Sequence, residues 1–150
     1  MTERVDFYVL KSAAPQQRWA FACRLTEKAY LRDLSVLIVS ASQAESAALD
    51  DLLWTFNEGS FIPHQICVNQ QAPDPAARVY LAASGSAPPP ADLLVNLTDR
   101  LPEAWERYPR IAEIIDADEE RRRLGRERFK SYRDGNVPLE THQLGPSARE

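Results

Sequence analysis

The chain has 150 residues, a length that suits one domain with a sizeable core. Its 44% hydrophobic and 27% charged residues are ordinary for a globular protein, and a net charge of −4 disfavours a general nucleic-acid binder. No apolar run approaches the roughly 18 residues of a membrane-spanning helix, and the amino terminus lacks a secretion signal. We therefore expect a cytoplasmic protein in which Cys23 and Cys67 are reduced, buried thiols.

The first part of the chain predicts two strands with a helix between them. Val5–Leu10 is a short apolar and aromatic run that is typical of a strand. Pro15 suits the first position of a helix, which we expect to continue to about Arg32. Ser35–Ser40 is apolar throughout its middle, as expected of a strand that is covered on both faces.

A second helix is predicted after this strand. Ser42 and Glu45 form a capping box at its start, and its apolar stripe ends near Phe56. The resulting strand–helix–strand–helix order indicates an α/β fold, a single domain with an open, mostly parallel sheet flanked by helices. Trp54 points away from the apolar stripe, so it is either buried by a second layer or offered to a partner.

Three further strands are predicted after the second helix. Proline-rich segments, which cannot continue a ladder, separate them. These strands are His64–Val68, Arg78–Ala83 and Leu93–Leu97. A helix from about Pro102 to Asp116, bent at Pro109, and a helix over Glu119–Arg133 should follow. Residues 134–150 are expected to form a loosely ordered tail outside the domain, which spans residues 1–133.

The sequence contains no recognisable catalytic, cofactor or metal motif. The turn after the first predicted strand, KSAAPQQ, lacks the glycines of a phosphate-binding loop. His64 and His142 are the only histidines and show no metal-ligand spacing, and neither cysteine has an obvious activating neighbour. We therefore expect no cofactor, no metal and no enzymatic activity of its own, and a nucleotide-binding-like topology would here lack its phosphate loop.

The most distinctive segment of the chain is Glu119–Arg133, in which basic residues are concentrated. It has seven basic and three acidic residues, so the rest of the chain carries a charge of −8, from −4 minus +4. Helical spacing brings cationic side chains and one aromatic ring to a shared face. These residues are Arg122, Arg126, Phe129 and Arg133, with Lys130 beside them.

This face suits an acidic peptide that ends in a hydrophobic residue and a free carboxylate. Arginine can bind the carboxylate through two hydrogen bonds, while the ring lines an apolar pocket. The alternative is a solvated, ion-paired helix whose Phe129 packs inward.

Two segments carry a resemblance to a known family. LLWTFNEGSFIPH, over residues 52–64, and LGRERFKSYR, over residues 124–133, match motifs of the chi subunit of bacterial DNA polymerase III. The chain resembles this family over nearly its full length, from DFYVL to about Arg133. The family pattern has tyrosine where this chain has Phe129, so the phenolic hydroxyl is missing.

The resemblance implies a non-catalytic accessory subunit of the replicative polymerase holoenzyme and its clamp loader. The subunit would belong to a DNA-directed DNA polymerase, a nucleotidyltransferase complex, at the replisome. It would capture the acidic C-terminal tail of single-stranded-DNA-binding protein. The implied tail-binding residues are Arg122, Arg126, Phe129 and Lys130, with Tyr132 and Arg133 as supports. The psi subunit or an accessory repair helicase would bind a surface made by Trp54, Phe61 and Pro63.

The sequence leaves three other functions open. A direct nucleic-acid-binding protein would use the basic helix on phosphates, although the acidic body and the missing aromatic stacking track disfavour it. An adaptor that serves mainly a repair helicase and a degenerate nucleotide-binding enzyme are the remaining alternatives.

Overall fold

A computed structural model of the chain describes residues 2–57, 62–67, 77–83 and 89–144. Within these residues, seven strands form one open sheet in the order β3-β4-β2-β5-β6-β1-β7, and all neighbouring strands are parallel. The strands are β1 (Arg4–Val9), β2 (Val36–Ser40), β3 (His64–Cys67), β4 (Val79–Ala83), β5 (Leu93–Asn96), β6 (Arg110–Ile115) and β7 (Leu139–Gln143). The expected single-domain α/β fold is confirmed.

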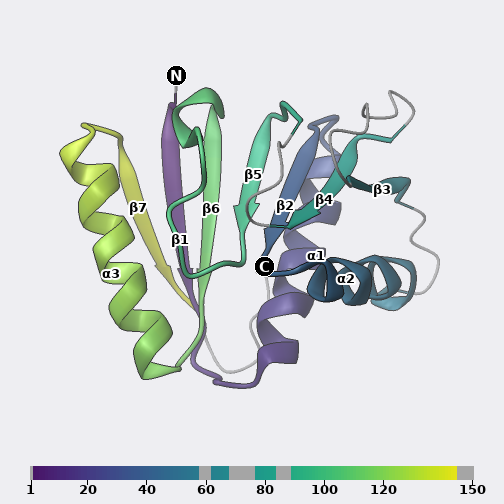
Figure 1. Cartoon of the computed structure of the whole chain (residues 1–150), viewed down its shortest axis with the longest axis horizontal. Coiled ribbons are helices and arrows are strands. Elements are labelled where there is room, and N and C mark those ends of the chain that lie inside the picture. Colours follow the sequence, from purple (N-terminus) through teal and green to yellow (C-terminus); the bar gives the residue numbers. More distant parts are fainter. Residues whose placement is uncertain (1, 58–61, 68–76, 84–88, 145–150) are drawn as a thin grey trace.

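Helices cover both faces of this sheet (Figure 1). α1 (Pro15–Tyr30) and α2 (Gln43–Thr55) pack on one face, where Phe21 and Leu49 are buried among strand residues. α3 (Glu119–Asp134) packs on the other face with the short 3-10 helix η1 (Trp105–Arg107), and Tyr132 is buried there. The sheet thus separates two apolar layers, because alternate side chains of each strand point to opposite faces.

The early elements agree with the predictions to within one or two residues. Ser42 is the N-cap of α2, and its hydroxyl accepts a hydrogen bond from the Glu45 amide at 3.2 Å. β2 is buried at every position, as its continuous apolar sequence predicts. Both cysteines are buried and unpaired, and burial raises the pKa of Cys23 to about 12.

The predicted helix from Pro102 to Asp116 is wrong. The segment is a single 3-10 turn followed by strand β6, which lies between β5 and β1. Pro109 lacks an amide hydrogen and breaks the segment, and its carbonyl accepts a hydrogen bond from the Glu3 amide at 2.7 Å. Residues 111–115 are all buried because β6 is covered on both faces, and such a continuous run also fits a helical stripe.

The expected loose tail from residue 134 also differs from the structure. Leu139–Gln143 form β7, which pairs with β1 in parallel, and the Leu144 amide donates to the Val9 carbonyl at 3.0 Å. β7 is an edge strand with mostly polar side chains, a composition that natural proteins use at exposed sheet edges. It therefore lacks the apolar alternation by which strands are recognised. Residues 145–150 lie outside the described part of the chain.

Among the described residues, none of the helices has both the length and the apolar character required to cross a bilayer.

Candidate functional site

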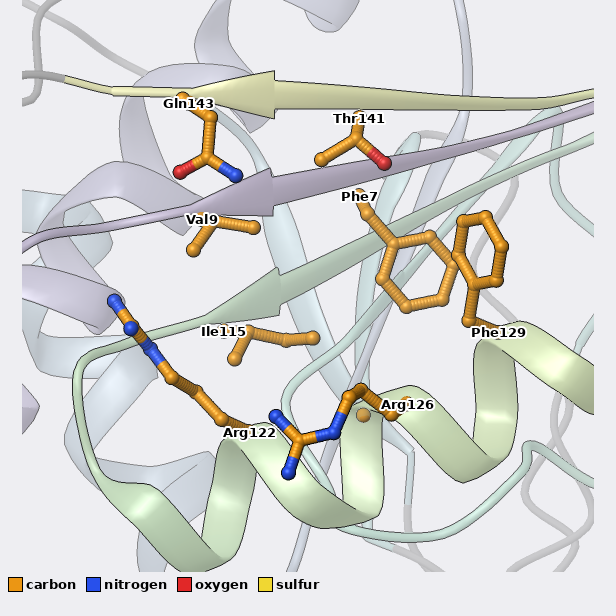
Figure 2. A pocket seen from close by; sticks show the side chains of 9 residues that line it. Phe7, Val9, Ile115, Arg122, Arg126, Phe129, Thr141 and Gln143 are labelled. Atoms are coloured by element: carbon orange, nitrogen blue, oxygen red, sulfur yellow. The ribbon is translucent and has the colours of Figure 1, made fainter.

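A hollow of about 260 Å³ lies between α3 and the edge of the sheet formed by β6, β1 and β7. Strand residues of one sheet face form its floor, and one face of α3 forms its other wall (Figure 2). We call this hollow the α3 pocket. Its lining residues are Phe7, Val9, Ile115, Arg122, Gly125, Arg126, Phe129, Thr141 and Gln143.

The strand register explains why these side chains meet. Phe7 is opposite Thr141, and Val9 is opposite both Ile115 and Gln143, so they share one face of three neighbouring strands. Helix α3 approaches this floor closely at Gly125. A β-carbon there would lie only 2.3 Å from the Ile115 Cδ1 atom, so the glycine allows the contact.

One end of the α3 pocket is aromatic. The Phe129 ring is half-buried, and its centroid lies 5.2 Å from that of Phe7 with the rings tilted by 60°. Figure 2 shows the two rings side by side, away from the arginines. Phe129 therefore packs inward, as in the alternative considered from sequence, and still presents ring surface to the hollow. An apolar side chain of a ligand would be buried here.

The other end of the pocket is cationic. The Arg122 guanidinium donates to two backbone carbonyls, those of Asp116 at 3.1 Å and Leu10 at 3.4 Å. These bonds hold the side chain over the floor without neutralising its charge. Arg126 is exposed and has no ion pair with any described residue. Two guanidinium groups are thus available to an anion beside the aromatic end.

The neighbouring arginines of the basic run are already engaged. Arg121 forms a bidentate pair with buried Asp116, at 2.8 and 2.7 Å. Burial alone would raise the pKa of Asp116, but the Arg121 bond and the Asp118 amide keep it below its usual value. Arg123 pairs on the exposed side of α3 with Glu120 and Glu127. Of the three consecutive arginines, Arg122 is therefore the one that lines the pocket.

The neighbouring face of α3 is fixed by a buried polar network. The Glu113 carboxylate is completely buried and accepts hydrogen bonds from Arg128 Nε at 3.1 Å and the Tyr132 hydroxyl at 2.7 Å. The Asn96 side-chain amide donates to both Glu113 oxygens. Burial raises the pKa of Glu113, and the three donors oppose that effect. This network docks α3 onto β6 and β5.

The structure therefore divides the predicted tail-binding residues. Arg122, Arg126 and Phe129 come together in the α3 pocket. Tyr132 is fully buried in the core, and Lys130 and Arg133 are exposed but do not line the pocket; these three were predicted to bind or support a ligand there.

Sequence reasoning missed the sheet side of the pocket. Phe7 and Val9 alternate with outward residues in a predicted strand, which is a usable signal. Thr141 and Gln143 belong to β7, where the sequence predicts a tail, so no signal pointed to them.

The second predicted surface lies at the other edge of the sheet, beside β3. Trp54 is 51% exposed, and its ring lies 4.4 Å from that of His64. The His64 ring nitrogens contact the Ile62 carbonyl at 2.7 Å and the Asp50 carboxylate at 2.9 Å, which ties α2 to β3. Pro63 is exposed next to it, and Phe61 lies outside the described residues.

The described lining of the α3 pocket offers guanidinium groups and apolar surface to a ligand. Of the described residues, no histidine, cysteine or carboxylate lines it. The fold and the pocket together define an all-parallel α/β protein with a cationic, aromatic-lined hollow at one sheet edge.

Comparison with known proteins identifies the family. The profile of the family described as DNA polymerase III chi subunit, HolC, matches residues 1–140. DNA polymerase III subunit chi of Pseudomonas aeruginosa is 38% identical over 144 residues, which are 94% of this chain and 96% of that protein. The same subunit of Haemophilus influenzae is 26% identical, over 97% of this chain and 100% of that protein. The chain belongs to the DNA polymerase III chi subunit family.

Solved structures add a similarity of fold alone. One chain of a complex of S. cerevisiae Dbp5 with Gle1 and IP6 superposes on this protein with a TM-score of 0.65 at 12% identity. The match covers 94% of this chain and 42% of that protein chain.

Proposed function

We propose that this protein is an accessory subunit of DNA polymerase III that captures the acidic, Phe-terminated tail of single-stranded-DNA-binding protein. The α3 pocket carries this proposal, because its aromatic end and its two guanidinium groups match the two parts of such a tail. The terminal ring would pack on Phe129 and Phe7, and the terminal carboxylate would bind Arg126 and Arg122. The subunit would thus hold the polymerase to protein-coated single-stranded DNA at the replisome.

Charge distribution supports a protein tail over naked DNA as the ligand. The chain outside residues 119–133 carries −8, so long polyanions are repelled from most of the molecule. On α3 itself, Arg121 and Arg123 are neutralised by carboxylates, and the half-buried Phe129 provides one pocket wall rather than a stacking track. A short acidic segment with one apolar end fits this layout.

The surface around Trp54 is proposed as the site of a second partner, the psi subunit or an accessory helicase. The Trp54 indole is 51% exposed and lies against the buried side chain of His64, beside exposed Pro63. A bound partner would remove this apolar surface from water. It lies beside β3, and the α3 pocket lies beside β7, at the two opposite edges of the sheet.

Replacing Arg126 tests the first proposal. Arg126→Ala should weaken binding of a synthetic acidic peptide ending in Phe by at least about tenfold, because a charge-assisted hydrogen bond contributes about 1.5–3 kcal/mol. Arg123→Ala is the matched control, since it removes a charge one turn away whose partners are Glu120 and Glu127. Calorimetry measures both affinities. Equal peptide affinity for wild type and Arg126→Ala would exclude this pocket as the tail site.

Trp54→Ala tests the second surface with the same preparations. It should abolish binding of the psi subunit or the helicase and leave peptide affinity unchanged, while Arg126→Ala should do the reverse. Co-purification with each candidate partner measures the loss of psi or helicase binding. Loss of both activities in either variant would indicate local misfolding, which thermal melting detects.

A further inference from the structure

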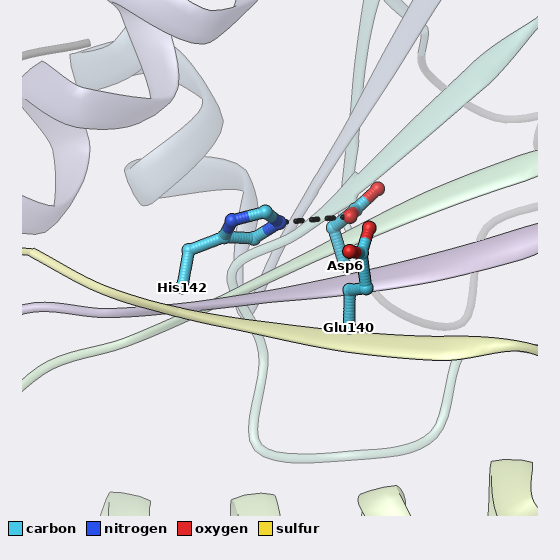
Figure 3. Close-up of side chains that lie close together, drawn as sticks. All are labelled: Asp6, Glu140 and His142. Carbon is cyan, nitrogen blue, oxygen red and sulfur yellow. Dashed lines mark hydrogen bonds and ion pairs between the residues drawn. The ribbon is translucent and has the colours of Figure 1, made fainter.

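The face of the sheet opposite the α3 pocket carries a cluster of charged side chains around Asp6. His142 Nε2 lies 2.9 Å from Asp6 Oδ1 (Figure 3). The His142 ring also stacks on Tyr8, with centroids 4.8 Å apart and planes at 16°. Arg4 hydrogen-bonds Asp6 at 2.9 Å and also pairs with Glu140. The contacts of His142 with Asp6 and Tyr8 and that of Arg4 with Glu140 join β7 to β1, whereas the Arg4–Asp6 bond lies within β1.

These contacts hold the strand that completes the α3 pocket. Glu140 and His142 point to one face of β7, and Thr141 and Gln143 point to the other, where they line the pocket. Among the described strands β7 pairs only with β1, so its position depends on that ladder, on the side chains that reinforce it and on its packing against α3. Its own carboxyl end is tied by the Leu144 amide to Val9.

Asp6, Glu140 and His142 also meet the distance requirement for three ligands of a metal ion, since one ligand atom of each lies within 4.8 Å of the others. The positive charge at this position is already supplied by protein. Arg4 bridges the two carboxylates, and Arg110 lies 3.4 Å from the second Asp6 oxygen. A metal ion would have to displace Arg4, so the cluster is better described as an ion-pair network.

We propose that the Asp6–His142 pair is a positioning element for the α3 pocket: it holds β7 in place from the reverse face of the sheet. This inference rests on the proposed function, because it concerns the wall of the same pocket. His142 is a positioning residue, since its side chain faces away from the ligand.

The acceptor at the centre of this network is the Asp6 carboxylate. Burial alone would raise the pKa of Asp6, but hydrogen bonds from His142 and Arg4 and nearby arginine charges keep it below its usual value. Asp6 is therefore ionised at neutral pH and accepts hydrogen bonds as a carboxylate. The charged groups nearby are Arg4, Glu140 and Arg110, and two further cations line the hollow next to Asp6, Lys28 of α1 and Arg32 just beyond its end.

The hydrogen bond from the His142 ring to this carboxylate is charge-assisted and therefore stronger than a bond between two neutral groups. It ties β7 to β1 near the residues that line the pocket, so its loss should loosen the β7 wall.

Two substitutions of His142 test whether its hydrogen bond to Asp6 anchors the pocket wall. His142→Ala should weaken binding of the acidic, Phe-ended peptide about three- to tenfold. His142→Gln can still donate to Asp6, so it should keep most of the affinity. His64→Gln, at the other edge of the sheet, is the matched control and should leave the peptide affinity unchanged. Calorimetry measures these affinities.

Hydrogen exchange provides a readout that needs no peptide. The backbone amides of Leu139–Gln143 should exchange faster in His142→Ala than in wild type, while those of β2 stay unchanged. Unchanged exchange of β7 in His142→Ala, or an affinity loss in His142→Gln as large as that in His142→Ala, would overturn the inference. So would thermal stabilisation by Zn²⁺ of wild type but not of His142→Ala, since that result assigns the cluster to a metal. A wild-type protein that binds no peptide would instead refute the proposed function.

Discussion

At the scale of residues, the segment LGRERFKSYR has side chains with two different roles on neighbouring faces of one helix. Arg126 and Phe129 face the α3 pocket, whereas Arg128 and Tyr132 are buried against Glu113. The Tyr132 ring also packs edge-on against Trp105, with centroids 5.0 Å apart. Tyr132 thus supports the site by holding the helix, although the sequence motif groups it with residues that contact a ligand.

Tyr132→Phe tests this division. The change removes one hydrogen bond to a buried carboxylate and keeps the ring, so the free energy of unfolding should fall by about 1–2 kcal/mol. Denaturant unfolding measures this loss. Peptide affinity of the folded protein should change less than twofold. A large loss of affinity with unchanged stability would place the hydroxyl at the ligand instead.

At the scale of elements, α3 is docked on the sheet by a buried charged pair as well as by the rings of Phe129 and Tyr132. Arg128 is only 5% exposed and Glu113 is fully buried, so both charges lose most of their hydration. One nitrogen of Arg128, Nη1, is buried without a partner among the described residues. Such a pair contributes little net stability, but removing one member leaves an uncompensated buried charge.

A double-mutant cycle at this pair tests how α3 is held. Glu113→Leu alone should lower the free energy of unfolding by about 3–5 kcal/mol, because Arg128 keeps its charge at any accessible pH. Arg128→Leu should cost less, since the pKa of Glu113 is already raised by burial and the carboxyl can take up a proton. Combining both changes should restore at least about 1 kcal/mol relative to Glu113→Leu. Strict additivity in denaturant unfolding would argue against a coupled pair.

At the scale of the whole molecule, the sheet order places the two proposed binding surfaces at opposite edges. The surface of Trp54 adjoins β3, and the α3 pocket adjoins β7, with five strands between these edge strands. Two partners could therefore be bound at once without contact between them, as a tether between two assemblies requires.

Salt should distinguish the two surfaces. Raising the salt concentration from about 50 to 500 mM should weaken peptide binding roughly tenfold, because the Arg122 and Arg126 charges are partly exposed and screened. Binding at the Trp54 surface should change much less, since it depends on apolar burial. Calorimetric titrations across this range measure both effects. Tight binding of naked single-stranded DNA with a steep salt slope would favour a direct nucleic-acid binder instead.

The sequence by itself determined the features that neighbouring residues encode. β1, β2 and both early helices follow from local apolar periodicity and from the Ser42 cap, and helical spacing alone brought Arg122, Arg126 and Phe129 to one face. The parallel sheet follows from the order of these elements.

Only the tertiary structure decided the features that depend on distant partners. β6 gave a helix-like pattern because burial on both faces removes strand alternation, and β7 became recognisable as a strand only through its pairing with β1. The partners of charged side chains are also distant in the sequence. Arg128 is neutralised by Glu113, 15 residues away, and His142 is held by Asp6, 136 residues away. Which cations remain available to a ligand is therefore a property of the fold, because ion pairing depends on distance in space and not on spacing in the sequence.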